Sequence, residues 1–63
     1  NRNILIDQIP HYARRIVSSG VLLLSGFYVD DLVKIQTCCK DHGFKFICNF
    51  KDDDWIAAKF IKS

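Results

Sequence analysis

The sequence predicts an α/β fold, and three patterns along its 63 residues carry that prediction. The segment Val21–Phe27 opens with four large apolar residues and is bounded by turn residues, which is typical of a strand buried on both faces. Amphipathic patterns with helical spacing lie before and after it. The segment Phe44–Phe50 then alternates in character, as strands do. Strands that alternate with helices are typical of a sheet covered by helices on both sides.

The chain is short for such a fold. A domain of this size buries only about 60% of the surface of its unfolded chain, so it cannot cover both faces of a central strand well. The sequence also begins at Asn1, without a methionine. Both features favour a piece of a larger domain.

The composition is that of a globular protein, with 49% hydrophobic and 25% charged residues. The net charge of +2 is too small to argue for nucleic-acid binding. No apolar run approaches the roughly 20 residues of a membrane span, and no secretory signal pattern is present. We therefore expect neither a nucleic acid nor a membrane as a direct partner.

The first helical pattern should run from a cap at Asn3 to about Val17. Pro10 lies inside it, and proline removes a helical hydrogen bond, so we expect a kink or a helix that restarts there. Ser18-Ser19-Gly20 should end the helix, with Gly20 in the left-handed conformation. The expected apolar stripe comprises Leu5, Ile9, Tyr12, Ala13, Ile16 and Val17.

The second helical pattern should begin at Asp30 and Asp31, since carboxylates favour a helix N-terminus. Gly43 is suited to end it. The expected apolar face comprises Leu32, Val33, Ile35, Cys39 and His42.

The two remaining segments should be strands that form a hairpin. Phe44, Phe46, Cys48 and Phe50 should face one way. A polar turn from Lys51 to Asp54 then leads to a last strand, Trp55–Ile61. The first two strands are joined by a helix and should run in parallel. From the residues alone, the last strand can lie outside them or between them.

The three cysteines, Cys38, Cys39 and Cys48, make a poor disulfide framework because their number is odd and two are adjacent. This favours a reducing compartment, and we expect a cytoplasmic protein. Cys38 and His42 could hold a metal together with Cys48, but the spacing is not one of a standard zinc site. Small buried fillers are the favoured interpretation, so we expect no metal.

Other candidate sites have a structural interpretation that is stronger than the functional one. The phenylalanine stripe of Phe44–Phe50 could stack RNA bases, which requires exposed rings, but the core needs these rings. Arg14 and Arg15 could bind phosphate, but positive charge also suits a helix C-terminus. His42, in a last helical turn, is more typical of a boundary residue than of a catalytic one.

Three short blocks carry a resemblance to a known family: Asn1-Arg2-Asn3-Ile4-Leu5, Gly20-Val21-Leu22-Leu23-Leu24-Ser25-Gly26-Phe27 and Trp55-Ile56-Ala57-Ala58. Together with the element order, they resemble the C-terminal end of a class I S-adenosylmethionine (SAM)-dependent methyltransferase. The similarity is to the type that methylates ribosomal protein L-eleven (PrmA type). It implies a Rossmann-like fold in which the last strand is central and antiparallel to its neighbours, within a three-stranded mixed sheet with two helices.

The resemblance also implies which parts are missing. The family's glycine-rich cofactor loop, its ribose-binding acid and its signature asparagine all lie before Asn1. We therefore expect residues 1–63 to be a single C-terminal fragment that is inactive alone, with no catalytic or cofactor-binding residue of its own. Ser25, Gly26 and Phe27 match the family at a strand end, and their implied role is to shape the substrate side of the pocket.

The parent function implied by the resemblance is SAM-dependent N-methylation of amines of a large-subunit ribosomal protein. The alternative is a free-standing α/β protein-interaction module. In the fragment interpretation, the strand Val21–Phe27 lacks a parallel neighbour that the resemblance places before Asn1, and it carries no lysine, proline or inward charge that would protect the free edge. We therefore expect weak self-association through this strand, with the segment Asn1–Asn3 partly masking the edge.

Overall fold

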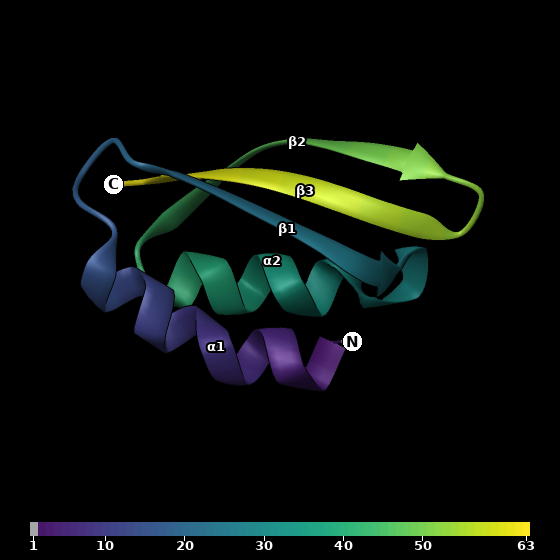
Figure 1. Cartoon of the computed structure of the whole chain (residues 1–63), viewed down its shortest axis with the longest axis horizontal. Coiled ribbons are helices and arrows are strands. Elements are labelled where there is room, and N and C mark those ends of the chain that lie inside the picture. Colours follow the sequence, from purple (N-terminus) through teal and green to yellow (C-terminus); the bar gives the residue numbers. More distant parts are fainter. Residues whose placement is uncertain (1) are drawn as a thin grey trace.

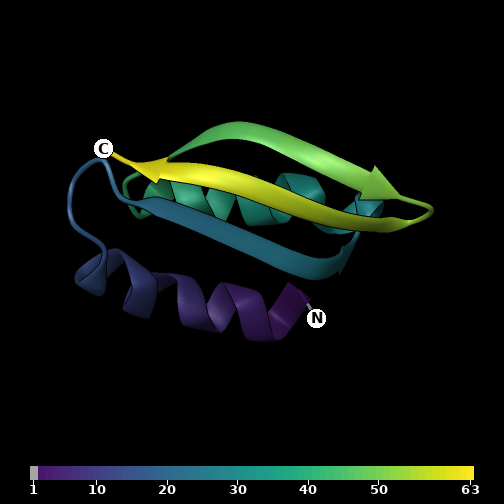
Figure 2. The same cartoon turned by 45° about the horizontal axis from the view of Figure 1, so that its top comes forward.

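Two helices lie against a single three-stranded sheet (Figure 1). A computed structural model describes residues 2–63. The elements are α1 (Arg2–Arg15), β1 (Val21–Tyr28), the 3₁₀ turn η1 (Val29–Asp31), α2 (Leu32–Asp41), β2 (Phe44–Asp52) and β3 (Trp55–Lys62). The two helices contact each other on the same side of the sheet, and no helix of residues 2–63 lies on the other side (Figures 1 and 2). We call this uncovered side the open face.

The last strand is central, as the family resemblance predicts. The order is β1-β3-β2, and both ladders are antiparallel. Consequently β1 and β2 point the same way on the two sides of β3 without pairing with each other. The expected parallel relation of the first two strands is therefore one of direction and not of pairing.

The expectation that β1 is buried on both faces is wrong. Leu22, Leu24 and Phe27 are buried, whereas Val21 and Leu23 are half exposed or more. The reason is the placement of both helices on one side, which leaves alternate residues of β1 on the open face. An apolar run without polar breaks does not indicate whether a strand is buried on one face or on both.

Helix α1 differs from its prediction at both ends. It already includes Arg2, so Asn3 is a helical residue and not a cap, and it ends at Arg15 instead of near Val17. The helix also continues through Pro10 without a break. Pro10 has no N–H for the carbonyl of Ile6. The Cys38 thiol of α2 lies 3.9 Å from that carbonyl oxygen and donates to it.

The predicted stripe of α1 is largely confirmed. Ile9 is fully buried, and four other members pack against the core: Leu5, Tyr12, Ala13 and Ile16. Val17 is exposed because it follows the last helical turn. In α2, Ile35 and Cys39 are buried as predicted, but Val33 is exposed.

In the turn after α1, the residue in the left-handed conformation is Ser19 and not Gly20. Ser19 has φ 69°, in the left-handed region that disfavours side chains. Gly20 is required for another reason: a Cβ on it would lie 2.5 Å from Ile16 Cγ2 and 2.8 Å from the Val17 carbonyl oxygen. Gly43 has φ 87°, and the prediction that it ends α2 is confirmed.

The end of α1 is tied to β3. The Lys62 ammonium donates to the carbonyl oxygens of Ala13 and Ile16, two groups that a helix C-terminus leaves without a helical donor. The Lys62 N–H donates to the Gly20 oxygen at 2.9 Å, and the Ser19 N–H donates to the Lys62 oxygen at 2.8 Å. These contacts fix α1 against the sheet at the amino end of β1.

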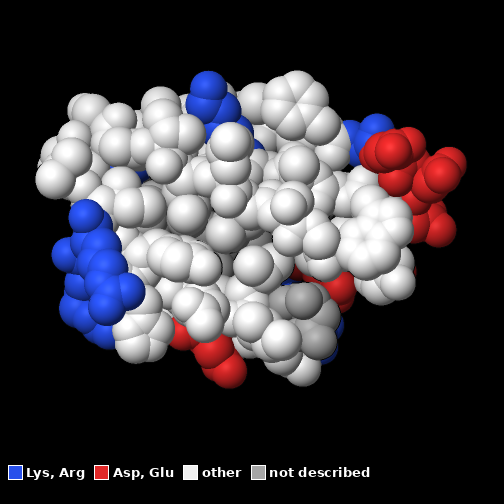
Figure 3. All heavy atoms as spheres, viewed as in Figure 1, with Lys and Arg blue, Asp and Glu red and all other residues white. Residues whose placement is uncertain are grey.

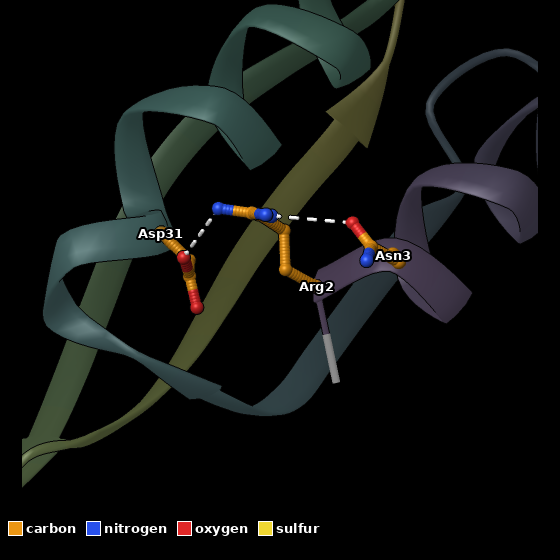
Figure 4. A network of polar contacts seen from close by, with 3 residues as sticks. All are labelled: Arg2, Asn3 and Asp31. Carbon is orange, nitrogen blue, oxygen red and sulfur yellow. Dashed lines mark hydrogen bonds and ion pairs between the residues drawn. The ribbon is translucent and has the colours of Figure 1, made fainter.

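The start of α2 is preceded by η1, and Asp31 makes no side-chain cap hydrogen bond. Its carboxylate instead pairs with the Arg2 guanidinium at 3.1 Å, while Arg2 Nε also donates to Asn3 Oδ1 at 3.4 Å (Figure 4). The acidic residue thus links the two helix starts. Both side chains are partly exposed, so the stabilisation from this pair is small.

The predicted single-sided stripe of β2 is wrong. The register shifts between Phe46 and Cys48, and such a bulge turns the following residues to the other face. Phe44 is buried and Phe46 packs edge-on against Phe60 with ring centroids 5.6 Å apart. Phe50 lies on the open face. The four residues therefore form no continuous stripe, and the RNA-stacking hypothesis based on one does not hold.

Candidate functional site

A β-bulge marks the carboxyl end of β1. The pairing with β3 shifts between Ser25 and Phe27, and Gly26 is the extra residue, with φ 85°. Glycine adopts this conformation without the cost that a side chain imposes. Because of the bulge, Ser25 stays on the open face opposite Ala57, while Phe27 turns into the core.

A cleft of about 370 Å³ lies on the open face at this bulge. Its wall is more apolar than polar, with the backbone of the bulge on one side and two exposed aromatic rings among its lining residues. The lining comprises Ser25, Gly26, Phe50, Lys51, Asp52, Trp55, Ile56 and Ala57. The cleft therefore draws on all three strands near the β2–β3 turn.

Tyr28 extends the site beyond the cleft. Its ring stacks on Trp55 with centroids 4.9 Å apart and planes inclined by 31°. Two smaller hollows also have Tyr28 in their walls: one of about 190 Å³ with Val29, Asp30 and Asp54, and one of about 220 Å³ with Arg2, Asn3 and Asp31. Aromatic surface thus continues from the cleft to the start of α1.

Charges are segregated along the molecule. Acidic residues cluster at the β2–β3 turn, with Asp52, Asp53 and Asp54, and follow β1 at Asp30 and Asp31. The last turn of α1 carries Arg14 and Arg15 instead. Figure 3 shows the red acidic group at the hairpin turn and a blue group at the opposite end. The cleft therefore lies at the acidic end of the sheet.

The structure brings two of the three predicted pocket residues together. Ser25 and Gly26 line the cleft, whereas the Phe27 side chain is 1% exposed and lies in the core on the other face. Sequence reasoning considered Phe50 only as part of the RNA-stacking stripe, and it assigned no site role to Tyr28 or Trp55. The signal for Trp55 was its place beside a polar turn and directly before Ile56. Neighbouring residues of a strand face opposite sides, so a core position for Ile56 puts Trp55 on the outer side.

Cys38 and His42 lie together near the end of α2, on the helix side of the sheet. His42 Nδ1 donates to the Cys38 carbonyl oxygen at 2.8 Å and lies 3.9 Å from its Sγ. Cys48 does not join them, and within residues 2–63 no three metal-ligating side chains come together. All three cysteines are free. Burial, followed by the Asp41 carboxylate, raises the pKa of the Cys38 thiol. Burial, followed by Cys38, raises the pKa of Cys39 to about 12.

Comparison with known proteins tests the resemblance that the sequence carries. No family model matches the chain. Three curated proteins, each named ribosomal protein L11 methyltransferase, are similar to it. The protein of Porphyromonas gingivalis is 37% identical over 60 residues, that of Phocaeicola vulgatus 36% over 61, and that of Bacteroides thetaiotaomicron 35% over 60. The resemblance inferred from the sequence is confirmed.

The similarity covers the chain much more fully than it covers these relatives. The alignments include 95% or 97% of this chain and 21% or 22% of the relatives. The chain thus spans about a fifth of the length of the methyltransferases that it matches. Among residues 2–63, no helix is long and apolar enough to span a membrane.

The thiols should differ strongly in reactivity. We expect alkylation at mildly alkaline pH to modify Cys48 first and to leave Cys39 unmodified until the chain unfolds, because Cys39 is fully buried and its raised pKa disfavours the reactive thiolate. Mass spectrometry of the labelled peptides measures this order, and a Cys48→Ser variant should lack the fast phase. Equal rates for Cys39 in native and denatured chains would contradict it. The native mass should show three thiols and no bound zinc.

Proposed function

We propose that this chain is the C-terminal fragment, residues 1–63, of the catalytic domain of a cytoplasmic SAM-dependent methyltransferase that methylates amines of a ribosomal protein. The observation that carries the proposal is the 34–37% identity to ribosomal protein L11 methyltransferases along almost the whole chain. The antiparallel central strand β3 agrees with the fold that the sequence resemblance implies.

The position of the cleft supports a substrate-side role for Ser25, Gly26 and Phe27. Ligands of open α/β sheets bind outside the carboxyl ends of the strands, and the bulge lies at that end of β1. In this proposal Ser25 and Gly26 form the wall of the pocket. Phe27 anchors the bulge from below, because its side chain is buried in the core.

The chemistry of the surface suits an amine substrate. Transfer of a methyl group to a neutral amine requires alignment and loss of water more than a strong base. Phe50 and Trp55 offer apolar surface for an aliphatic stem, and Asp52 lines the same cleft. Acidic residues at this end of the sheet attract a positively charged protein substrate. Its amine loses a proton only after the substrate has bound.

A chimera tests the proposed function. The 63 residues replace the matched 60-residue segment of the Porphyromonas gingivalis relative, and transfer of labelled methyl groups from SAM to its ribosomal protein L11 is measured. We expect the chimera to transfer methyl groups and the relative without the segment to be inactive. A chimera that folds by circular dichroism but transfers no methyl group would contradict the proposal.

The isolated chain should not bind SAM, because the resemblance places the cofactor loop and the ribose-binding acid before Asn1. Titration with SAM should leave the amide chemical shifts of residues 2–63 unchanged. The bulge residues Ser25 and Gly26 are the sensitive reporters, since they line the cleft. Saturable shifts there at micromolar SAM would show that these residues hold the cofactor and would contradict the fragment interpretation.

A free-standing interaction module is the second candidate, and the open face favours it. Leu23, Phe50 and Trp55 are each at least half exposed there, and exposed apolar patches mark interaction sites. In the fragment interpretation, weak self-association through the outer edge of β1, which has no paired strand among residues 2–63, stays a prediction. The segment expected to mask this edge is Asn1–Asn3: Arg2 and Asn3 are residues of α1, and Asn1 lies outside the described residues.

A further inference from the structure

The open face has an ordered pattern of charge around an apolar centre. Residues directly opposite one another in a sheet share a face, and the two registers place Lys45, Ile61 and Val21 in one row at the amino end of β2. Asp52, Trp55 and Tyr28 form the row at the other end. The outer strand β2 therefore carries a positive residue at one corner of the open face and a negative residue at the other.

Apolar surface lies between these corners. Leu23 of β1 is 67% exposed, Phe50 of β2 is 64% exposed and Trp55 of β3 is 50% exposed. One cation, Lys59, lies near the centre of the face, opposite Leu23 and Cys48. The partner of this face must therefore bring apolar surface, opposite charge at both corners of β2 and no cation facing Lys59.

A second copy of the chain meets these requirements in one orientation. A two-fold axis parallel to the sheet and perpendicular to its strands places Lys45 of each copy against Asp52 of the other, at both corners. The same axis places Lys59 of each copy opposite Ala57 of the other copy, so the two Lys59 side chains do not face each other. A two-fold axis along the strands instead places Lys59 against Lys59 of the second copy, and like charges in contact are unfavourable.

We propose that two copies of this chain associate through their open faces, with the strands of the two sheets antiparallel across the interface and Lys45 paired with Asp52 of the other copy. Face-to-face sheets pack with strand directions within about 30° of each other. The interface would include Phe50, Asp52 and Trp55, which also line the cleft that the proposed function assigns to the substrate, so a second copy and a substrate would compete for the open face.

The size of the face sets the strength of the association. Strands of eight residues are about 26 Å long, and three strands are about 14 Å wide, which gives a flat footprint of roughly 400 Å² per copy. Two such faces bury roughly 800 Å² in total, which is less than the roughly 1,200 Å² at which stable interfaces begin and is typical only of weak, transient contacts. We therefore expect a rapidly exchanging dimer with a dissociation constant in the micromolar to millimolar range.

The first test is sedimentation equilibrium of the wild-type chain from micromolar to millimolar concentration. We expect a monomer–dimer equilibrium that weakens as salt is added, because the corner pairs are exposed and screened. A chain that stays monomeric over this range would overturn the proposal and would leave the open face to a different polypeptide.

Charge reversal tests the orientation. Lys45→Asp places two acids against each other at both corners, and Asp52→Lys places two cations there, so each variant alone should raise the dissociation constant by roughly tenfold. An equimolar mixture of the two variants should recover wild-type affinity, because a heterodimer restores opposite charges at both corners. Lys34→Asp, on the exposed side of α2, is the matched control and should leave association unchanged. No recovery in the mixture would overturn the proposed pairing.

Phe50→Lys separates this proposal from pairing through the edge of β1. Strands β1 and β2 lie on opposite edges of the sheet, so the substitution adds a cation to the open face without touching the β1 edge. We expect a folded monomer, verified by circular dichroism. Dimers that persist in Phe50→Lys would show edge pairing and would overturn the face-to-face arrangement.

Discussion

Phe60→Ala should unfold most of the chain at room temperature. Phe60 is fully buried in β3, the strand that pairs with both others. Truncation of a buried phenylalanine costs about 3–5 kcal/mol. The core of a 63-residue domain rarely supplies more than about 3–5 kcal/mol of net stability. We expect loss of the sheet signal in circular dichroism, or a urea midpoint close to zero.

Phe50→Ala is the matched control for this prediction. The residue type and the truncation are the same, but the Phe50 ring lies on the open face and is 64% exposed. Surface substitutions of this kind change the free energy of unfolding by about 0.5 kcal/mol or less. Similar losses of stability in the two variants would contradict the assignment of the core to the helix side of the sheet.

Gly20→Ala should be the most destabilising of the small substitutions. The added Cβ would lie 2.5 Å from Ile16 Cγ2 and 2.8 Å from the Val17 carbonyl oxygen. The backbone oxygen cannot move away without disturbing the end of α1. Overpacking of this kind costs about 1–3 kcal/mol, which urea denaturation followed by Trp55 fluorescence would measure.

The neighbouring position should respond with the opposite sign. Ser19 has φ 69°, a conformation that costs about 1–2 kcal/mol for a residue with a side chain. Ser19→Gly removes that cost, although the flexible unfolded chain offsets part of the gain. We expect a net stabilisation of about 0.5 kcal/mol. A stabilising Gly20→Ala together with a destabilising Ser19→Gly would mean that the left-handed residue is Gly20 after all.

The order of elements could be read from the sequence because it depends on local periodicity. Ile9 and Ile35 mark the helical stripes, and the turn residues around Gly43 and the acidic hairpin mark the ends of strands. The turn chemistry of Ser25 and Gly26 likewise indicated one end of the candidate site. The central position of β3 did not follow from the residues themselves and came only from the resemblance to methyltransferases.

What lies on each face was decided by the tertiary structure. Periodicity states which residues share a side of a strand, but not whether anything covers that side. Leu23 and Phe50 are therefore as apolar as Leu24 and Phe44, yet they face outward. The difference arises because both helices pack on one side of the sheet.

The register was also decided only in three dimensions. The bulges at Gly26 and after Phe46 change which side the following residues occupy, and they depend on how β1 and β2 pair with β3. No local pattern encodes that pairing. The sequence by itself therefore determined the helices, the strands and their order along the chain. The tertiary structure determined the open face and the cleft between Gly26, Phe50 and Trp55, because both are products of pairing and packing between segments distant in the chain.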